Sequence, residues 1–434
     1  MNEKSKENFS INNLLEIIDV EVKEILESAL DGDDISSSDI EKLLQTQNLE
    51  YQSTILVADE LRRRSSGNLV TYVVNRNINF TNVCIKRCGF CAFSRDYQGE
   101  QGYLLPISEI VRRAKEAWEY GASEVCIQAG LPPKMEGDLY LKITDAIKQE
   151  LPEIHIHGFS PEEVLYGSIR SNCSIKQYLN DLKSAGVGSL PGTSAEILDQ
   201  DLRDKISPGR ITVNQWKEVI TTAHEIGIPT TSTIMFGHVE TFKHIADHLV
   251  LIREMQKQTG GVTEFVPLSF VNSEAPMFLQ GLNGTQNVKS GPTGMDVIKM
   301  HAISRIVLNN WISNIQASWV KEGDRMSQLL LNSGVNDLGG TLINESISTS
   351  AGALHGQLKP PAEFRGMIRD AGRIPAERFT DYQIKNIFDL NEVEHDPLDF
   401  VGDNSEEIFG SYKQLITQEE FRYSHPNPIS SRSK

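Results

Sequence analysis

Two patterns of hydrophobic and polar positions divide the chain. Residues 11–62 place apolar side chains three or four positions apart, as at Leu14, Ile18 and Val22, which predicts amphipathic helices. Beyond that stretch, short runs of branched and apolar residues alternate with longer amphipathic segments. The first pattern predicts an N-terminal helical segment over residues 1–68, placed ahead of a larger domain.

The second pattern predicts strands that alternate with helices. The expected strands cover 77–80, 124–128, 154–159, 188–190, 230–235, 263–268, 314–318 and 336–338. The expected helices between them include 106–120, 139–149, 175–185, 214–226, 241–257 and 295–309. This alternation indicates an α/β fold with a parallel sheet, and about eight repeats favour a closed (β/α)8 TIM-type barrel over an open sheet. We expect the barrel over residues 69–345.

The remainder of the chain is expected to be a C-terminal helical extension over 346–390 and an acidic, partly disordered tail over 391–434. The net charge of −17 lies at the two ends of the chain. Residues 1–60 hold fifteen acidic and four basic side chains, residues 387–434 hold ten and four, and the middle is neutral. Without a basic patch, nucleic acid is not an expected partner.

No apolar run approaches the roughly 20 residues that span a bilayer. The N-terminus also lacks the basic-then-apolar order of a signal peptide. We therefore expect a cytoplasmic protein without a membrane partner.

Three of the five cysteines form the pattern C-x3-C-x2-C, as Cys84, Cys88 and Cys91. Three thiolates this close predict ligands for three irons of a [4Fe–4S] cluster, whose fourth iron is then open to a small chelating molecule. A structural zinc site is the alternative, but zinc prefers four ligands, usually as two separated pairs. The spacing is typical of the radical S-adenosylmethionine (SAM) enzymes.

Polar residues on or just after the predicted strands are candidates for binding, because barrels place active sites at the carboxyl ends of their strands. Candidates for SAM contacts are Phe90, Gln128, Gly130 and Glu196. Candidates for substrate contacts are His155, His157, His238, Glu264, Gln316 and Asn336. The pair His155 and His157 shares one strand face and is expected to point into the barrel. Tight turns, helix termini, satisfied core histidines and internal hydrogen-bond networks are the structural alternatives.

Several stretches resemble one branch of the radical SAM enzymes. They are 75–84, 155–161, 191–196, 237–240 and 336–342, within a resemblance that covers roughly residues 55–385. The branch contains menaquinone-pathway enzymes that act on futalosine derivatives and enzymes that build the deazaflavin FO. The run from Asn336, continued by Asn344-Glu345-Ser346-Ile347, is most similar to the tyrosine-using subunit of the FO synthase family.

This resemblance implies a radical SAM transferase with a [4Fe–4S] cluster and SAM as cofactors. It implies that the 4-hydroxybenzyl group of L-tyrosine is joined to 5-amino-6-(D-ribitylamino)uracil, with release of 2-iminoacetate, 5′-deoxyadenosine and methionine. The implied partners are an electron donor and, because this chain has one cysteine triad, a separate radical SAM enzyme that completes FO. The resemblance assigns no catalytic residue. A radical SAM enzyme of menaquinone (futalosine) biosynthesis and a non-catalytic cluster protein are the alternatives.

Overall fold

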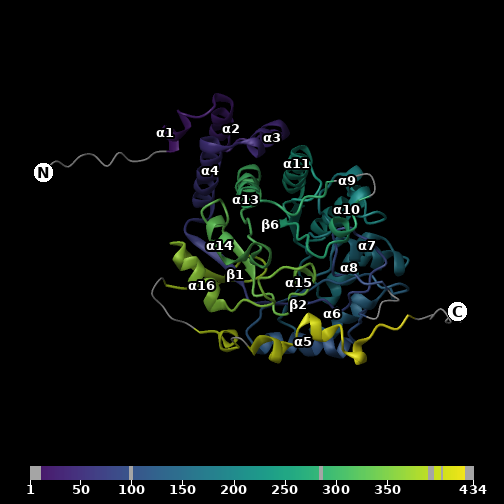
Figure 1. The fold of residues 1–434 in the computed structure, drawn as a ribbon. Coiled ribbons are helices and arrows are strands. Elements are labelled where there is room, and N and C mark those ends of the chain that lie inside the picture. Colours follow the sequence, from purple (N-terminus) through teal and green to yellow (C-terminus); the bar gives the residue numbers. More distant parts are fainter. Residues whose placement is uncertain (1–10, 97–100, 283–286, 390–394, 402–403, 426–434) are drawn as a thin grey trace.

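The computed structural model describes residues 11–96, 101–282, 287–389, 395–401 and 404–425 (Figure 1). Its strands are β1 (Leu69–Val73), β2 (Asn75–Ile78), β3 (Glu124–Ile127), β4 (His155–Gly158), β5 (Thr230–Phe236), β6 (Val262–Ser269), β7 (Asp337–Gly340), β8 (Ile374–Arg378) and β9 (Ile384–Ile387). Its helices are α1 (Ile11–Leu15), α2 (Val20–Asp31), α3 (Ser37–Gln45), α4 (Asn48–Ser66), α5 (Ile107–Glu119), α6 (Leu139–Glu150), α7 (Pro161–Arg170), α8 (Ile175–Ala185), α9 (Gln200–Ile206), α10 (Val213–Glu225), α11 (Phe242–Thr259), α12 (Pro276–Leu279), α13 (Gly294–Leu308), α14 (Trp319–Leu330), α15 (Ile347–Ser350), α16 (Pro361–Asp370), α17 (Ser405–Phe409) and α18 (Tyr412–Leu415).

The parallel strands close into the predicted (β/α)8 barrel. β2 pairs with β3, and β3 pairs with β4. Residues 189–190 bridge β4 to β5, β5 pairs with β6, and residues 315–316 bridge β6 to β7. β7 pairs with β1, and the continuation of β7 bridges β2 where Ile343 lies opposite Arg76. The strand ring is therefore continuous, so its carboxyl ends meet around one opening.

Helix-capping side chains start many of the outer helices. Ser160, Thr212, Thr241 and Thr293 each accept a backbone N–H at the start of α7, α10, α11 and α13. A cap of this kind stabilises a helix by about 1 kcal/mol. All six helices predicted between the strands are observed, with bounds within two residues of those expected.

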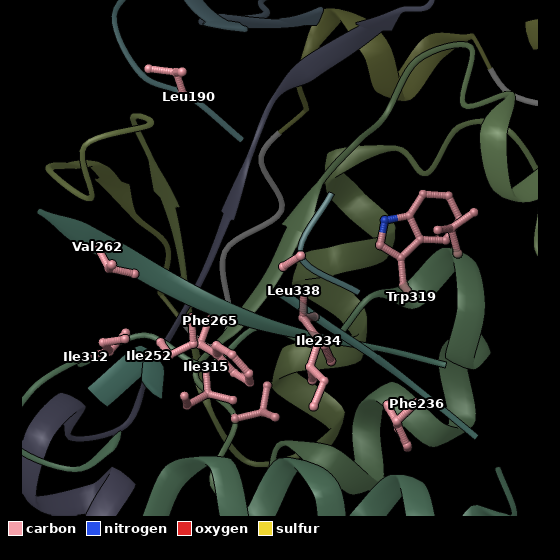
Figure 2. Close-up of a cluster of buried hydrophobic side chains, with 14 of the residues drawn as sticks. Leu190, Ile234, Phe236, Ile252, Val262, Phe265, Ile312, Ile315, Trp319 and Leu338 are labelled. Carbon is pink, nitrogen blue, oxygen red and sulfur yellow. The ribbon is translucent and has the colours of Figure 1, made fainter. Parts of the chain in front are cut away.

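The main hydrophobic core lies between the strands and the helices that surround them. Ile234 of β5 and Phe265 of β6 pack with Ile252 of α11, and all three side chains are fully buried (Figure 2). Burying one such side chain stabilises the fold by about 1.5–3 kcal/mol. Because outward strand positions hold the apolar residues, inward positions are open to polar side chains such as Asn77 and His157.

The N-terminal helices pack on the outside of the barrel, with α4 against α13 and α3 against α11. In Figure 1 these helices (purple) and the C-terminal segment (yellow) lie at opposite ends of the molecule. Within the described residues, no helix combines the length and the apolar character needed to cross a membrane. The domain boundary expected at residue 68 stays a prediction.

The segment after the barrel differs from the expectation in two ways. Besides α15 and α16, the expected helical extension over 346–390 contains β8, which pairs parallel with β1, and β9, which pairs antiparallel with β8. The described part of the expected tail is also packed: Arg365 donates to Asp399 at 2.7 Å, and the rings of Tyr120 and Phe409 meet edge-on at 5.0 Å. These contacts are tertiary, so local composition did not reveal them. The rest of that tail lies outside the described residues.

Candidate active site

A cavity of about 320 Å³ lies at the carboxyl ends of the barrel strands. Its lining includes Phe90 and Cys91 after β2, Gln128 after β3 and Glu196 beyond the fourth strand. Other hollows of about 580 to 650 Å³ are larger. They do not contain the cysteine loop, whereas the 320 Å³ cavity joins that loop to the strand ends, where barrel enzymes place their chemistry.

The loop that carries the three cysteines is fixed on both sides through Gly89. Its N–H donates to the carbonyl of Ile206, and its carbonyl accepts from the N–H of Met277, both at 2.7 Å. A Cβ at residue 89 would lie 2.9 Å from the Cβ of Met277. The glycine between Cys88 and Phe90 is thus needed for the close approach of this loop to the rest of the barrel mouth.

The cysteine side chains fit an iron–sulfur cluster. Cys84, Cys88 and Cys91 are free thiols, and the described residues contain no group of three His, Cys, Asp or Glu side chains arranged to hold a metal ion. A [4Fe–4S] cluster takes cysteine thiolates as its ligands, so the three thiols of this loop would supply all but one of the four that it needs. Burial raises the pKa of the Cys88 and Cys91 thiols, and the Arg210 guanidinium opposes this rise. Binding of iron would therefore supply the charge that stabilises the thiolates.

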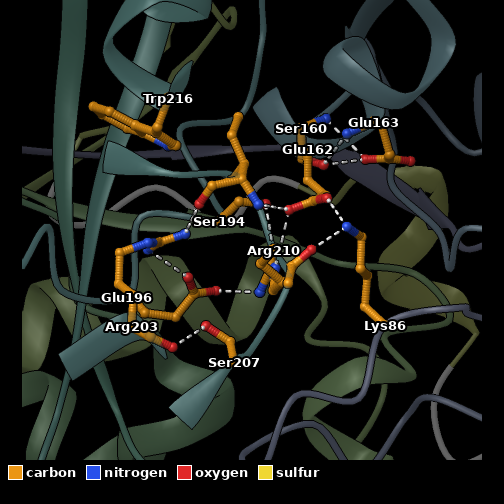
Figure 3. Close-up of polar contacts among 12 residues, drawn as sticks. Lys86, Ser160, Glu162, Glu163, Ser194, Glu196, Arg203, Ser207, Arg210 and Trp216 are labelled. Carbon is orange, nitrogen blue, oxygen red and sulfur yellow. Dashed lines mark hydrogen bonds and ion pairs between the residues drawn. The ribbon is translucent and has the colours of Figure 1, made fainter. Parts of the chain in front are cut away.

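Arg210 connects the cysteine loop to Glu196. Its Nη1 donates to Glu196 Oε1 at 2.8 Å, and its Nη2 donates to Ser194 Oγ at 2.6 Å (Figure 3). Its guanidinium carbon lies 5.8 Å from the centre of the Phe90 ring. Arg203 Nη1 donates to the other oxygen of Glu196 at 3.2 Å. Both oxygens of Glu196 are held by arginines, yet each keeps a lone pair for a ligand at the cavity.

Glu162 extends this network to the cysteine loop. Lys86, which lies between Cys84 and Cys88, has its Nζ 3.3 Å from Glu162 Oε1. Arg210 Nε donates to Glu162 Oε2 at 3.3 Å. Sequence reasoning missed Arg210 and Glu162, because no motif marks them and their roles arise only where two separate loops meet.

The turn after β3 places Gln128 and Gly130 differently. Gln128 lines the cavity, and its Oε1 accepts from the Thr193 hydroxyl at 2.7 Å. Gly130 is not among the described lining residues. A Cβ at residue 130 would lie 2.3 Å from the Val83 carbonyl oxygen, so this glycine lets the turn pack behind the start of the cysteine loop. Gly130 therefore supports the loop that carries the three cysteines.

The two histidines of β4 share a strand face and bind the same hydroxyl. His155 Nε2 and His157 Nδ1 each lie 2.7 Å from Ser189 Oγ. Of the two, His157 lines the cavity, whereas His155 lines a separate hollow beside Phe379 and Thr380. Burial lowers the pKa of His157 to about 4, so its ring is neutral at pH 7.

Glu264 is not part of the described cavity lining. Its Oε2 accepts from Arg378 Nη2 at 3.4 Å and from the Tyr382 hydroxyl. Both partners come from the β8–β9 hairpin, which meets the amino ends of the strands. Strand periodicity predicts which face Glu264 occupies, but it does not predict how deep along the barrel the residue lies.

Asn336 and His238 also lie outside the described lining. Asn336 Oδ1 accepts from Arg305 Nη2 at 2.7 Å and from the N–H of Ile315 at 3.0 Å. His238 Nε2 lies 3.1 Å from the Met235 carbonyl, to which it donates. Their predicted contacts with substrate stay predictions, and the hydrogen bonds present tie each residue to its own surroundings.

Three polar groups face the cavity without a partner in the described part of the chain. Gln316 lines it and its side-chain amide makes no hydrogen bond there. The Oδ1 of Asn77 is buried and unpartnered. Lys321 is the third, and sequence reasoning singled out neither Lys321 nor Asn77 as a binding residue. Asn77 Oδ1 is the buried one, and buried polar groups are rarely left unpaired, whereas Gln316 and Lys321 are half-buried and open to the cavity. Together these three groups suit polar ligands.

Two family models match the chain in succession. Residues 78–252 match the Radical SAM superfamily, and residues 259–390 match the CofH/MqnC C-terminal region. Among solved structures, methylornithine synthase (PylB) superposes with a TM-score of 0.64 at 17% identity, covering 81% of this chain and 97% of that one. The FeFe-hydrogenase maturase HydG from Carboxydothermus hydrogenoformans gives 0.64 at 16% identity, covering 86% and 83%. At these identities the likeness concerns the fold.

Curated relatives are more similar in sequence. The chain is 45% identical over 366 residues to the 5-amino-6-(D-ribitylamino)uracil–L-tyrosine 4-hydroxyphenyl transferase of Methanothermobacter thermautotrophicus, covering 84% of this chain and 98% of the relative. It is 49% identical over 330 residues to the enzyme of the same name from Methanocaldococcus jannaschii, covering 75% and 90%. The chain belongs to the radical SAM superfamily and, within it, to the family of these 4-hydroxyphenyl transferases.

Proposed function

We propose that this protein transfers the 4-hydroxybenzyl group of L-tyrosine to 5-amino-6-(D-ribitylamino)uracil, with release of 2-iminoacetate, 5′-deoxyadenosine and methionine, in the biosynthesis of FO. The observation that carries this function is the 45% identity that extends over 98% of a relative whose name states both substrates. The menaquinone (futalosine) alternative is not favoured by the names of these relatives.

Cys84, Cys88 and Cys91 would hold the [4Fe–4S] cluster of the superfamily. When reduced and bound to SAM, the cluster supplies a 5′-deoxyadenosyl radical for hydrogen abstraction from tyrosine. The protein's own task is then to position two substrates and to exclude water from the cavity.

On the cysteine side of the cavity, Phe90, Gln128 and Glu196 would contact SAM. SAM carries an ammonium and ribose hydroxyls, which are hydrogen-bond donors. The Glu196 carboxylate and the side-chain Oε1 of Gln128 can accept from such donors. Arg210 holds Glu196 in place, and Thr193 holds Gln128. The contribution of Gly130 would be indirect, through the packing of the loop.

The other walls of the cavity suit a pyrimidine with a ribityl chain. His157 is neutral and uses Nδ1 for Ser189, which leaves Nε2 for a substrate N–H or hydroxyl. The Gln316 amide and Asn77 Oδ1 add a donor and two acceptors. These residues would orient the uracil so that its ring faces the group arriving from tyrosine.

Two partners follow from the proposed chemistry. SAM cleavage consumes an electron, which requires an external donor. The adduct still lacks the closed deazaflavin ring, and this chain has one cysteine triad. A separate radical SAM enzyme would therefore receive the adduct and complete FO.

The proposed function is tested by anaerobic reaction of the reconstituted protein with dithionite, SAM, L-tyrosine and 5-amino-6-(D-ribitylamino)uracil, followed by mass spectrometry. We expect a hydroxybenzyl adduct of the pyrimidine together with 5′-deoxyadenosine. Formation of 5′-deoxyadenosine without the adduct, at saturating concentrations of both substrates, would reject the substrate assignment. A parallel reaction with a futalosine-type substrate tests the alternative.

A further inference from the structure

Lys321 occupies an unusual position at the cavity. It lies in the first turn of α14, directly after the seventh strand of the barrel, and it lines the cavity. Among the described lining residues it is the one Lys or Arg. Within the described chain its ammonium group makes no hydrogen bond and no ion pair, although burial lowers its pKa.

The two carboxylates near Lys321 are already committed to other donors. Glu345 accepts the backbone N–H of Ser348 at 2.7 Å and that of Thr349 at 3.1 Å, at the start of α15. Glu322 accepts from the Ser269 hydroxyl at 2.5 Å. Both carboxylates raise the pKa of Lys321 electrostatically, against the effect of burial. The lysine therefore stays near negative charge without a direct partner.

Arginines around the barrel interior are paired, whereas Lys321 is half-buried, open to the cavity and unpaired within the described chain. Arg210 donates to Glu196 at 2.8 Å, and Arg378 donates to Asp337 at 2.6 Å. A buried charge is costly unless a counter-charge and hydrogen bonds compensate it. An unpaired ammonium that faces a ligand cavity is therefore suited to an anionic group of the ligand.

We infer that Lys321 binds the α-carboxylate of the amino-acid substrate and thereby selects an α-amino acid over the corresponding amine. The inference rests on the proposed function, which supplies L-tyrosine as a substrate. The ribitylaminouracil carries no anionic group, so it cannot supply the counter-charge. SAM also has a carboxylate, but the residues proposed to contact SAM follow strands one, two and four, whereas Lys321 follows strand seven.

The test compares binding of L-tyrosine and tyramine, which lacks the carboxylate, to the cluster-loaded protein in the presence of SAM by isothermal titration calorimetry. In Lys321→Met we expect L-tyrosine to bind about 10- to 100-fold more weakly, which corresponds to loss of one charge-assisted hydrogen bond. Tyramine binding is expected to stay unchanged, so the preference of the wild type for L-tyrosine disappears. Lys321→Arg keeps the charge and is expected to restore most of the preference.

Arg325→Met, at an exposed position of the same helix, is the matched control and is expected to retain wild-type binding of both ligands. SAM affinity, measured separately, is expected to be the same in Lys321→Met and wild type, which also establishes that the cavity is intact. An unchanged preference for L-tyrosine in Lys321→Met overturns the inference, and so does a loss confined to SAM binding. A wild-type protein that forms no adduct rejects the proposed function itself and this inference with it.

Discussion

The two ends of the barrel interior both contain polar side chains, but they use them differently. At the amino ends of the strands, Arg378 donates to Asp337 at 2.6 and 3.1 Å and to Glu264 at 3.4 Å, and Tyr382 also donates to Glu264. At the carboxyl ends, Gln316 and Lys321 face the cavity without partners in the described chain. At the amino ends, here called the closed end, the carboxylates of Asp337 and Glu264 are thus taken up by the protein's own donors. At the carboxyl ends, here called the open end, polar side chains are left for ligands.

The β8–β9 hairpin accounts for this difference. It brings Arg378 and Tyr382 to the closed end, and Thr380 donates from the same hairpin to Glu124 at 2.7 Å. A buried polar residue in a barrel is therefore a weak sign of a binding site until its own partners are known. Polar groups that remain unpaired after folding are the stronger sign.

The largest effect is expected from removing a cysteine at the open end. Cys84→Ala, Cys88→Ala or Cys91→Ala should each abolish cluster assembly and 5′-deoxyadenosine formation, because three thiolates are needed to hold the cluster. Iron content and absorption spectra of the reconstituted protein measure this. Cys173→Ala, away from the loop, should keep both iron and activity. Full iron loading in any of the three loop variants would contradict the ligand assignment.

At the closed end, Arg378→Met should act on stability. It leaves Asp337 buried without its cation, and breaking a buried ion pair in this way costs about 3–5 kcal/mol. Denaturant unfolding should show this loss. Affinity for SAM in the folded variant should stay close to that of the wild type. A variant of unchanged stability with weakened SAM binding would reverse the roles assigned to the two ends.

His157 lines the cavity and should also make stability depend on pH. Burial lowers its pKa to about 4, from the ordinary histidine value of about 6.5. Below pH 6.5 the unfolded chain takes up a proton before the native one, so the free energy of unfolding falls by about 1.4 kcal/mol per pH unit down to pH 4. His157→Gln should remove this contribution, as measured by urea unfolding at pH 6.5 and 5. An identical slope in both proteins would show that the native ring is protonated as readily as the unfolded one.

The smallest effect is expected for Gln316→Ala. The amide has no partner in the described chain, so its loss should leave the free energy of unfolding unchanged. Binding of 5-amino-6-(D-ribitylamino)uracil should weaken about tenfold if one neutral hydrogen bond is lost. Glu264→Gln is the counterpart at the closed end and should spare substrate binding. If Glu264→Gln weakens substrate binding more than Gln316→Ala does, the assignment of ligand binding to the carboxyl ends alone is incorrect.

Sequence patterns predicted the barrel, its outer helices and the cysteine loop because each rests on local information. Hydrophobic periodicity marks the outward face of strands such as β4 and β6, and C-x3-C-x2-C is a contiguous motif. β8 was missed because its residues become a strand only by pairing with β1. The packed C-terminal segment was missed because an acidic composition does not show which residues find partners, as Asp399 does with Arg365.

The candidate site was predictable only in part for the same reason. Phe90, Gln128, Glu196, His157 and Gln316 line the cavity as a group of strand-end residues. The positions of Glu264, Asn336 and His238 depend on depth along the strand and on partners distant in sequence. Arg210 and Lys321 carry no motif, so they emerged only from the spatial arrangement.

The C-terminal segment reaches the loop that carries the cysteines. Asn82, just before this loop, donates from Nδ2 to the Tyr412 hydroxyl at 3.5 Å, and the rings of Phe93 and Tyr412 are 5.7 Å apart. Proteins are synthesised from the N-terminus, so Tyr412 leaves the ribosome long after the cysteines do. The cysteine loop thus acquires its last packing contacts near the end of translation, and its final conformation belongs to the finished chain and not to the nascent one.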